Sequence, residues 1–202
     1  RAAQVQQQGV NQPPPMIEPI LRQSLDELAE MLPRLRGLHA PLQSLADSLM
    51  QCWQRGGKAL LAGNGGSAAD AMHFAEELVV RFRKDRRALA AMSLCDPTVL
   101  TCAGNDFGFD RVFSRQVEAL GNEGDMLIAL TTSGNSPNIL RAVESARARK
   151  MRTVAFLGGD GGQLRGLCDI ELIVPSAVTH HVQEGHKILF HVVCQWVDGK
   201  VS

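Results

Sequence analysis

The sequence predicts an α/β protein: a three-layer αβα sandwich on a five-stranded parallel sheet, with an N-terminal helical arm. From residue 58 onward, five short and almost continuous apolar runs alternate with helical patterns. Strands that are buried on both faces give such continuous runs, and parallel strands need crossover connections that are usually helical. Between residues 17 and 54, apolar residues recur at helical spacing before any strand pattern begins.

The element boundaries follow from these patterns. Residues 1–15 are polar, rich in Gln and end in three prolines, so we expect a disordered tail there. Residues 16–57 should form two helices interrupted at Pro33, and residues 58–202 the sheet domain, with both parts packed as one structural domain. An amphipathic arm of this kind suits a subunit interface, although a helix docked within the chain would show the same pattern. The expected strands cover residues 58–62, 88–94, 126–130, 153–157 and 170–174, and the expected later helices cover residues 67–82, 97–103, 109–120, 137–150 and 181–197.

Composition narrows the function. The 21 Lys and Arg residues balance the 21 Asp and Glu residues, which argues against a nucleic-acid or membrane-surface binder. The apolar runs fall short of the roughly 20 residues that a membrane span needs. Five cysteines, an odd number with no CxxC pair, indicate buried reduced thiols. We therefore expect a cytoplasmic protein with neither nucleic-acid nor membrane partners.

A glycine-rich loop, residues 63–67, follows the first expected strand and runs directly into a helix. Glycines let the backbone turn tightly and approach a ligand, and a helix N-terminus binds anions. Ser67 could cap that helix or offer a hydroxyl to a ligand. A dinucleotide fold is an alternative, because Gly63, Gly65 and Ala68 fit the relaxed fingerprint. That fingerprint also expects an acidic residue about 20 residues later, and Asp96 comes well beyond that.

A hydroxyl-rich loop follows the third expected strand and also leads into a helix. It carries four hydroxyls, those of Thr131, Thr132, Ser133 and Ser136. Hydroxyls and backbone amides at a helix N-terminus can hold phosphate without a fixed positive charge. The simpler interpretation is an N-cap, since Ser136 precedes Pro137. One cap uses one hydroxyl, so four favour a phosphate site, and two such loops suit a phosphosugar.

Five motifs in this order resemble the phosphoheptose isomerase family, which has the sugar isomerase (SIS) fold with a flavodoxin-like sheet. They are GNGGS at residues 63–67, DAMHFAEEL at 70–78, GNDFG at 104–108, SGNS at 133–136 and VQEGH at 182–186. The resemblance runs from the second N-terminal helix to the end of the chain. Two features depart from it: Thr131 stands where the family commonly has Ser, and residues 179–181 lack the acidic residue and arginine often found there.

The resemblance implies a zinc site with one ion per subunit. The matching positions are His73, Glu77, Gln183 and His191. Spacing is compatible with this, because residues four apart, and residues eight apart, share a helix face. Spacing alone would equally suit a surface ion pair at His73 and Glu77, and a hydrogen-bonded core histidine at His191. Nitrogen and oxygen ligands of these types can complete a four-coordinate zinc shell, although Gln is an uncommon ligand.

The implied activity is aldose–ketose isomerisation. Sedoheptulose 7-phosphate would become D-glycero-D-manno-heptose 7-phosphate through an enediol, in the biosynthesis of heptose for bacterial surface lipopolysaccharide. By resemblance, Glu77 is the base and His191 the acid, and the protein is a homotetramer with the N-terminal helices at interfaces. The implied substrate-binding residues are Asn64, Gly65, Gly66, Ser67, Glu77, Asn105, Asp106, Thr131, Thr132, Ser133, Ser136 and Gln183.

Two other functions fit the same fold. One is a non-catalytic SIS-fold interaction protein that resembles a bacterial replication-initiation partner. The other is a phosphosugar sensor that binds without turnover. The joint presence of His73, Glu77, Gln183 and His191 speaks against the interaction protein, because a binding module needs none of them.

Overall fold

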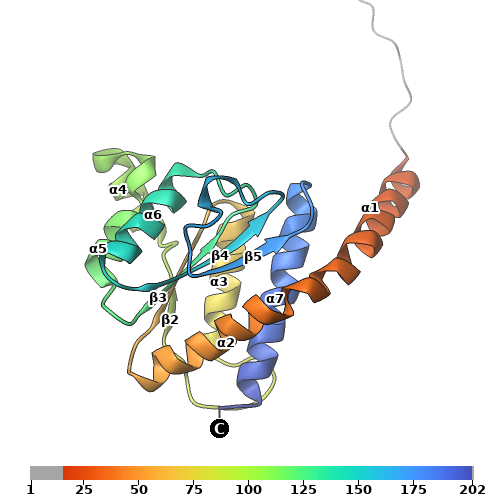
Figure 1. Ribbon diagram of the computed structural model, residues 1–202. Helices are drawn as coiled ribbons and strands as arrows, with labels where there is room; N and C mark the ends of the chain where they lie inside the picture. The colour runs from red at the N-terminus through yellow and green to blue at the C-terminus, as the bar shows by residue number, and fades with distance from the viewer. Residues whose placement is uncertain (1–15, 202) are drawn as a thin grey trace, which may run out of the picture.

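The computed structural model describes residues 16–201, so the tail expected over residues 1–15 lies outside the described part of the chain. A parallel sheet with helices on both faces forms the body, and a helical arm projects from it (Figure 1). The strand order is β2-β1-β3-β4-β5, and every pairing is parallel. The predicted three-layer αβα sandwich is therefore confirmed. The strands are β1 (Ala59–Gly63), β2 (Ala91–Ser93), β3 (Met126–Leu130), β4 (Arg152–Gly158) and β5 (Ile170–Val174).

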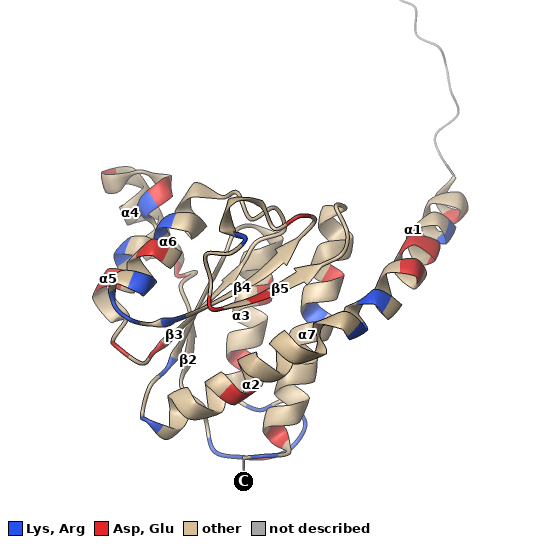
Figure 2. Ribbon diagram, in the orientation of Figure 1, with Lys and Arg blue, Asp and Glu red and all other residues tan. Residues whose placement is uncertain are grey.

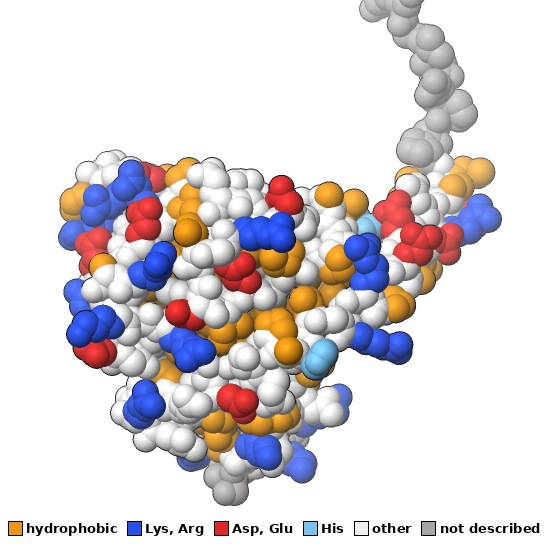
Figure 3. All heavy atoms as spheres, in the orientation of Figure 1, with side chains coloured by type: hydrophobic (Ala, Val, Ile, Leu, Met, Phe, Trp, Pro, Cys, Tyr) orange, Lys and Arg blue, Asp and Glu red, His pale blue; other side chains and the backbone are white. Residues whose placement is uncertain are grey.

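The arm contains two α-helices, as predicted, and a 3₁₀ helix occupies the interruption at Pro33. Helix α1 (Ile17–Met31) leads into a 3₁₀ helix, η1 (Leu32–Leu38), and then into α2 (His39–Gln54). Pro33 does not break the arm, because it occupies the first turn of η1, where no N–H is needed. Apolar side chains on α1 are exposed to solvent, including Ile17 at 78% and Leu25 at 57%, and Figure 3 shows apolar side chains along this arm.

Two helical layers cover the sheet. Helices α2, α3 (Gly66–Val79) and α7 (Thr179–Asp198) pack on one face, and α4 (Pro97–Phe107), α5 (Ser114–Leu120) and α6 (Pro137–Ala148) pack on the other. Successive strand residues point to opposite faces, so Leu61 joins the first core and Leu60 the second. Short 3₁₀ turns, η2 (Phe109–Arg111) and η3 (Gly162–Leu164), complete the connections.

Some boundaries differ from the prediction. The second strand has three residues instead of seven: it is an edge strand, and only Ala91–Ser93 pair with β1. Helix α3 ends at Val79 rather than at residue 82, and the segment after it turns back so that Arg86 can bond to the last turn of α3. The helix expected over residues 109–120 divides into η2 and α5.

The strand order has a switch point between β1 and β3. Gly63, the last residue of β1, is in register with Leu130, the last of β3. The chain leaves β1 toward α3 on one face and leaves β3 toward α6 on the other. Ligands of such sheets bind where neighbouring loops diverge in this way. The glycine loop and the hydroxyl loop therefore meet at the expected binding position, and the order is the flavodoxin-like one, not that of the dinucleotide alternative.

Charge is mixed across the surface, and Figure 2 shows acidic and basic residues interspersed on helices of both layers. Within residues 16–201, no helix combines the length and apolar character that crossing a bilayer requires. All five cysteines are unpaired in this part of the chain. Cys52 and Cys194 are buried as expected, but Cys102 is exposed on α4, on a face where Val99 is exposed as well.

Candidate active site

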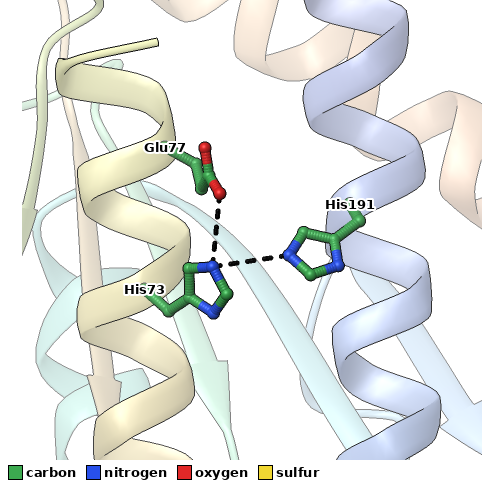
Figure 4. A group of neighbouring side chains, drawn as sticks. All are labelled: His73, Glu77 and His191. Carbon is green, nitrogen blue, oxygen red and sulfur yellow. Dashed lines mark hydrogen bonds and ion pairs between the residues drawn. The ribbon is translucent and has the colours of Figure 1, made fainter. Parts of the chain in front are cut away.

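Helices α3 and α7 bring three of the predicted residues together. In Figure 4, His73 and Glu77 point from α3 toward His191 on α7. Nε2 of His73 lies 3.2 Å from Oε1 of Glu77 and 3.5 Å from Nε2 of His191. The two helices pack closely through the stacked rings of Phe74 and Phe190, whose centroids are 5.1 Å apart. Residues 118 positions apart in the chain thus form one polar cluster beside an aromatic core.

The cluster fits a cation. Nε2 of His73 faces both the carboxylate oxygen of Glu77 and Nε2 of His191. The single hydrogen on Nε2 cannot form a well-aligned hydrogen bond to both of these atoms. One ligand atom from each of His73, Glu77 and His191 lies within 4.8 Å of the others. Two imidazole nitrogens and one carboxylate oxygen, with a position left open, form the donor set of many catalytic zinc sites. These donors therefore suit the metal that the resemblance implies.

The surroundings shift the proton affinities of two of these groups. Burial raises the pKa of Glu77, and the neighbouring charge of Glu76 adds to this, while His73 opposes it. Burial lowers the pKa of His191, and the nearby His73 and Lys187 lower it further. Glu77 is thus a stronger base than an ordinary glutamate, and His191 favours its neutral form.

Gln183 lies apart from the cluster of His73, Glu77 and His191. Its side-chain amide sits against Gly66 at the start of α3, where the carbonyl carbon of the amide would be 3.0 Å from a Cβ on that glycine. Eight residues separate it from His191 on α7, which corresponds to about 12 Å along the helix axis. Within one chain, the structure therefore groups His73, Glu77 and His191, and places the Gln183 amide beside the glycine loop. A metal-binding role for Gln183 stays a prediction.

The glycine loop is shaped by backbone constraints. Gly65 precedes α3 as its N-cap with φ +54°, a value that favours glycine. Ser67 is buried within the first turn of α3, so the interpretation of Ser67 as the N-cap is wrong: the helix begins one residue earlier, at Gly66. In the first turn of α3, the N–H groups of residues 67–69 bond to the carbonyls of Asn64 and Gly65. The N–H of Gly66 is therefore the first-turn donor that a bound anion could use.

An amide pair joins the two loops. The side chains of Asn64 and Asn138 donate to one another at 2.9 Å and 2.8 Å. Asn138 lies in the first turn of α6 and is 2% exposed. Because the Asn64 side chain is occupied in this way, residues 64–66 are placed to contact a ligand mainly through backbone groups. The sequence reasoning missed Asn138, and its only signal was a polar residue directly after Ser136 and Pro137.

The four hydroxyls of the second loop have different roles. The buried Thr131 hydroxyl accepts the N–H of Gly134, and the Ser133 hydroxyl accepts the N–H of Asn135, so both shape the loop. Ser136 precedes α6 as its N-cap residue, yet among the described residues its side chain makes no capping hydrogen bond. The N-cap interpretation of that hydroxyl therefore does not hold, and the Ser136 hydroxyl can serve a ligand.

A cavity of about 350 Å³ lies between the loops. It is lined by Asn64, Phe109, Asp110, Ser136, Pro137 and Asn138. Asn105 and Asp106, predicted to contact substrate, are exposed at the end of α4, where their side chains bond to each other at 2.7 Å. The structure thus unites the two loops at one cavity but does not place this pair in its lining. Asp110, which the sequence did not single out, pairs with Arg141 at 2.6 Å beside the cavity.

Comparisons with known proteins define the class of protein. Residues 24–158 match the family model described as SIS domain. A phosphoheptose isomerase of Burkholderia pseudomallei is 53% identical over 165 residues, which cover 81% of this chain and 84% of the relative. Solved phosphoheptose isomerases give the same result. The protein from Francisella tularensis has a TM-score of 0.88 and 35% identity, covering 92% of this chain and 100% of that one. The protein from Neisseria gonorrhoeae has a TM-score of 0.85 and 39% identity, covering 91% and 100%.

The fold, the paired loops and the family model define a SIS-domain protein of the sugar-phosphate class. Within that class, the identity to curated relatives over most of the chain decides the family. The chain belongs to the phosphoheptose isomerase family and is an isomerase. The predicted resemblance is therefore confirmed.

Proposed function

We propose that this chain interconverts sedoheptulose 7-phosphate and D-glycero-D-manno-heptose 7-phosphate through an enediol. The observation that carries the proposal is the convergence of Glu77, His73 and His191 from two helices. A non-catalytic interaction protein or a phosphosugar sensor has no need for a carboxylate of raised pKa beside two imidazoles. In the cell we place this reaction in the cytoplasm, in the supply of heptose for lipopolysaccharide.

Glu77 and His191 divide the proton transfers. The Glu77 carboxylate removes the proton from the carbon next to the carbonyl, and it returns that proton to the adjacent carbon. The His191 imidazole, neutral at physiological pH because burial and its neighbours lower its pKa, exchanges protons with the substrate oxygens. His73 holds the Glu77 carboxylate in place through their 3.2 Å contact.

The other end of the sugar lies in the two loops of a second copy of the chain, because the loops of one chain are too far from its own Glu77. The Ser136 hydroxyl and the backbone amides at the start of α6 bind the phosphate, while Thr131 and Ser133 keep the loop in shape. Thr132 adds a further hydroxyl. Asn64 lines the same cavity, and together with Gly65 and Gly66 it faces the sugar from the side of the glycine loop.

A zinc ion would be held by His73, Glu77 and His191. When bound, it would polarise substrate oxygens as a Lewis acid. A carboxylate that binds metal is a weaker base, so the two roles of Glu77 oppose each other.

Two features of the cluster support the proposed homotetramer. Glu77 lies eleven residues beyond Gly66, about 16 Å along α3, which exceeds the length of an extended seven-carbon phosphosugar. The helix faces around the cluster also expose apolar side chains, among them Val80 at 62% and Val192 at 48%. A second copy packed there would cover this apolar surface and bring its own loops, with Gln183, to the cluster. The apolar arm supplies further contact area.

Activity on the ketose phosphate tests the proposal. Purified full chain incubated with sedoheptulose 7-phosphate should produce the aldose phosphate, followed by NMR of the anomeric protons. His191→Ala should reduce turnover strongly, while His39→Ala, at an exposed position on the arm, should not. Binding of the ketose phosphate without turnover would support the sensor, and neither binding nor turnover would support the interaction protein.

Metal content tests the zinc site separately. We expect about one zinc ion per chain by mass spectrometry, and a large loss in His73→Ala but not in His39→Ala. Gln183→Leu tests whether the Gln183 side chain of a second copy supplies a fourth zinc ligand. If it does, the substitution removes that ligand and the affinity for zinc should fall. Full zinc content in His73→Ala would contradict the site.

A further inference from the structure

A buried ion pair joins the ends of the two helices that carry the active-site cluster. Nε of Arg86 donates to Oδ1 of Asp198 at 2.9 Å. The Arg86 side chain is 0% exposed and that of Asp198 is 4% exposed. Arg86 belongs to the segment that follows α3, and Asp198 is the last residue of α7. The ion pair therefore links the segment after α3 to the C-terminal end of α7.

Arg86 bonds directly to the backbone that carries Glu77. Its Nη2 donates to the carbonyl oxygen of Glu77 at 2.7 Å, and its Nη1 donates to the carbonyl of Leu78 at 3.0 Å. The last carbonyls of a helix have no partner within the helix, so the guanidinium completes this helix end. The planar guanidinium of Arg86 carries several N–H donors in a fixed arrangement, so it can donate to two adjacent carbonyls and a carboxylate at the same time.

Asp198 fixes the guanidinium and the segment around it. Its Oδ2 accepts the backbone N–H groups of Arg83 at 2.7 Å and of Lys84 at 3.1 Å. Burial acts to raise the pKa of Asp198, but these hydrogen bonds and Arg86 outweigh it and the pKa is lowered, so the carboxylate stays ionised. His191 precedes Asp198 by seven residues, two turns of α7, and lies on the same side of that helix.

We infer that Arg86 and Asp198 are positioning residues for the isomerase reaction: together they set the distance between Glu77 on α3 and His191 on α7. The inference rests on the proposed function, in which these two groups exchange protons with one substrate. A general base and a general acid must be held within a fraction of an ångström, and a misplacement of about 1 Å can cost about 100-fold in rate. The phosphate-binding loop, between β3 and α6, lies beside the glycine loop at the start of α3, whereas the ion pair lies at the other end of α3. Substrate affinity should therefore be nearly independent of this pair.

The chain contains a matched control. Asp125 also accepts two backbone N–H groups, from Lys58 and Asn122 at 2.9 Å each, and one side-chain cation, Lys58. Its side chain is 4% exposed, as is that of Asp198. This pair joins the starts of β1 and β3, two central strands, and its backbone hydrogen bonds run to Lys58 and Asn122 and not to α3 or α7. Asp198→Asn and Asp125→Asn therefore remove equivalent buried carboxylates with and without a link to the active site.

The test compares Asp198→Asn, Arg86→Lys and Asp125→Asn in the full-length protein. We expect kcat on sedoheptulose 7-phosphate to fall about 10- to 100-fold in the first two, with KM within about twofold of wild type. Asp125→Asn should lower the melting temperature yet keep kcat within about twofold. Arg86→Lys keeps the charge and supplies the result if Asp198→Asn does not fold. Equal kcat losses in Asp198→Asn and Asp125→Asn, or wild-type kcat in Arg86→Lys, would overturn the inference.

Crystal structures separate this inference from the proposed function. In Arg86→Lys, the distances between α3 and α7 should lengthen, first of all the 3.5 Å contact of His73 with His191, while the 3.2 Å contact of His73 with Glu77 within α3 should persist. In Asp125→Asn, both contacts should persist. If the wild type is inert on ketose phosphates, the proposed function fails, and these distances alone decide whether the ion pair positions the cluster. Unchanged distances in Arg86→Lys would refute the positioning role.

Discussion

Replacing Glu77 by Gln should reduce kcat on sedoheptulose 7-phosphate by about 10²- to 10⁴-fold, the range for loss of a general base. Gln matches Glu in size, so the half-buried side chain still packs and can still contact His73. Its amide cannot accept the substrate proton. We therefore expect a protein that melts near the wild-type temperature and binds substrate with little change in KM, but scarcely turns it over.

Glu76→Gln is the control for this substitution. Glu76 is the adjacent residue on α3, its side chain is 56% exposed, and its carboxylate lies 4.0 Å from Nε2 of His73. Both variants remove one negative charge near His73, but only one removes the proposed base. Exchange of the substrate's C–H proton with solvent deuterium, followed by NMR, should vanish in Glu77→Gln and persist in Glu76→Gln. Similar rates in both variants would assign the base elsewhere.

The pH profile of the wild type has a defined direction. A base acts when deprotonated, so kcat/KM should fall as the pH drops through the pKa of Glu77. Burial raises that pKa, and therefore this acidic limb should lie above the range of an ordinary glutamate. The residual activity of Glu77→Gln should lack this limb.

Local sequence patterns predict most of the secondary structure. Strands β1 and β3 are buried on both faces and read as unbroken apolar runs, so their positions could be predicted to within a residue. Strand β2 could not, because residues 88–94 are as apolar as a full strand although only Ala91–Ser93 pair with β1. Pairing at a sheet edge depends on the path of the preceding loop, which a single sequence does not encode locally.

The site was predictable where it depends on one helix turn. His73 and Glu77 are four residues apart, and helical spacing alone places them on one face. The pairs Asn64 with Asn138 and Arg86 with Asp198 join residues 74 and 112 positions apart, and no spacing rule reaches across such distances. Gln183 and His191 show the limit of the same spacing rule: they share a helix face, yet eight residues of rise separate them by about 12 Å within one chain.

Replacing Gly134 by Ala should have the largest effect of any single methyl group in the phosphate-binding loop. Gly134 has φ +65°, and a Cβ there would overlap the carbonyl oxygen of Gly161 and stand 2.6 Å from its carbonyl carbon. The loop after β3 and the loop after β4 are in backbone contact here, and the N–H of Leu164 donates to the carbonyl of Gly134 at 3.1 Å. A side chain must push the two loops apart, which displaces the hydroxyls that bind phosphate.

Gly159→Ala separates the clash from the backbone strain. Gly159 has a similar φ of +61°, but no atom lies within 4 Å of its Cβ position among the described residues. In Gly159→Ala, the free energy of unfolding should fall by about 1–2 kcal/mol, which is the cost of a left-handed backbone conformation for alanine. In Gly134→Ala, the free energy of unfolding should fall by about 3 kcal/mol or more, because the atom that a Cβ meets belongs to the backbone and cannot move aside as a flexible side chain would. The KM for the phosphosugar should rise at least about 10-fold. Denaturant melts and steady-state kinetics measure both quantities. Equal stability and equal KM in the two variants would mean that the close approach of the two loops does not hold the phosphate site in shape.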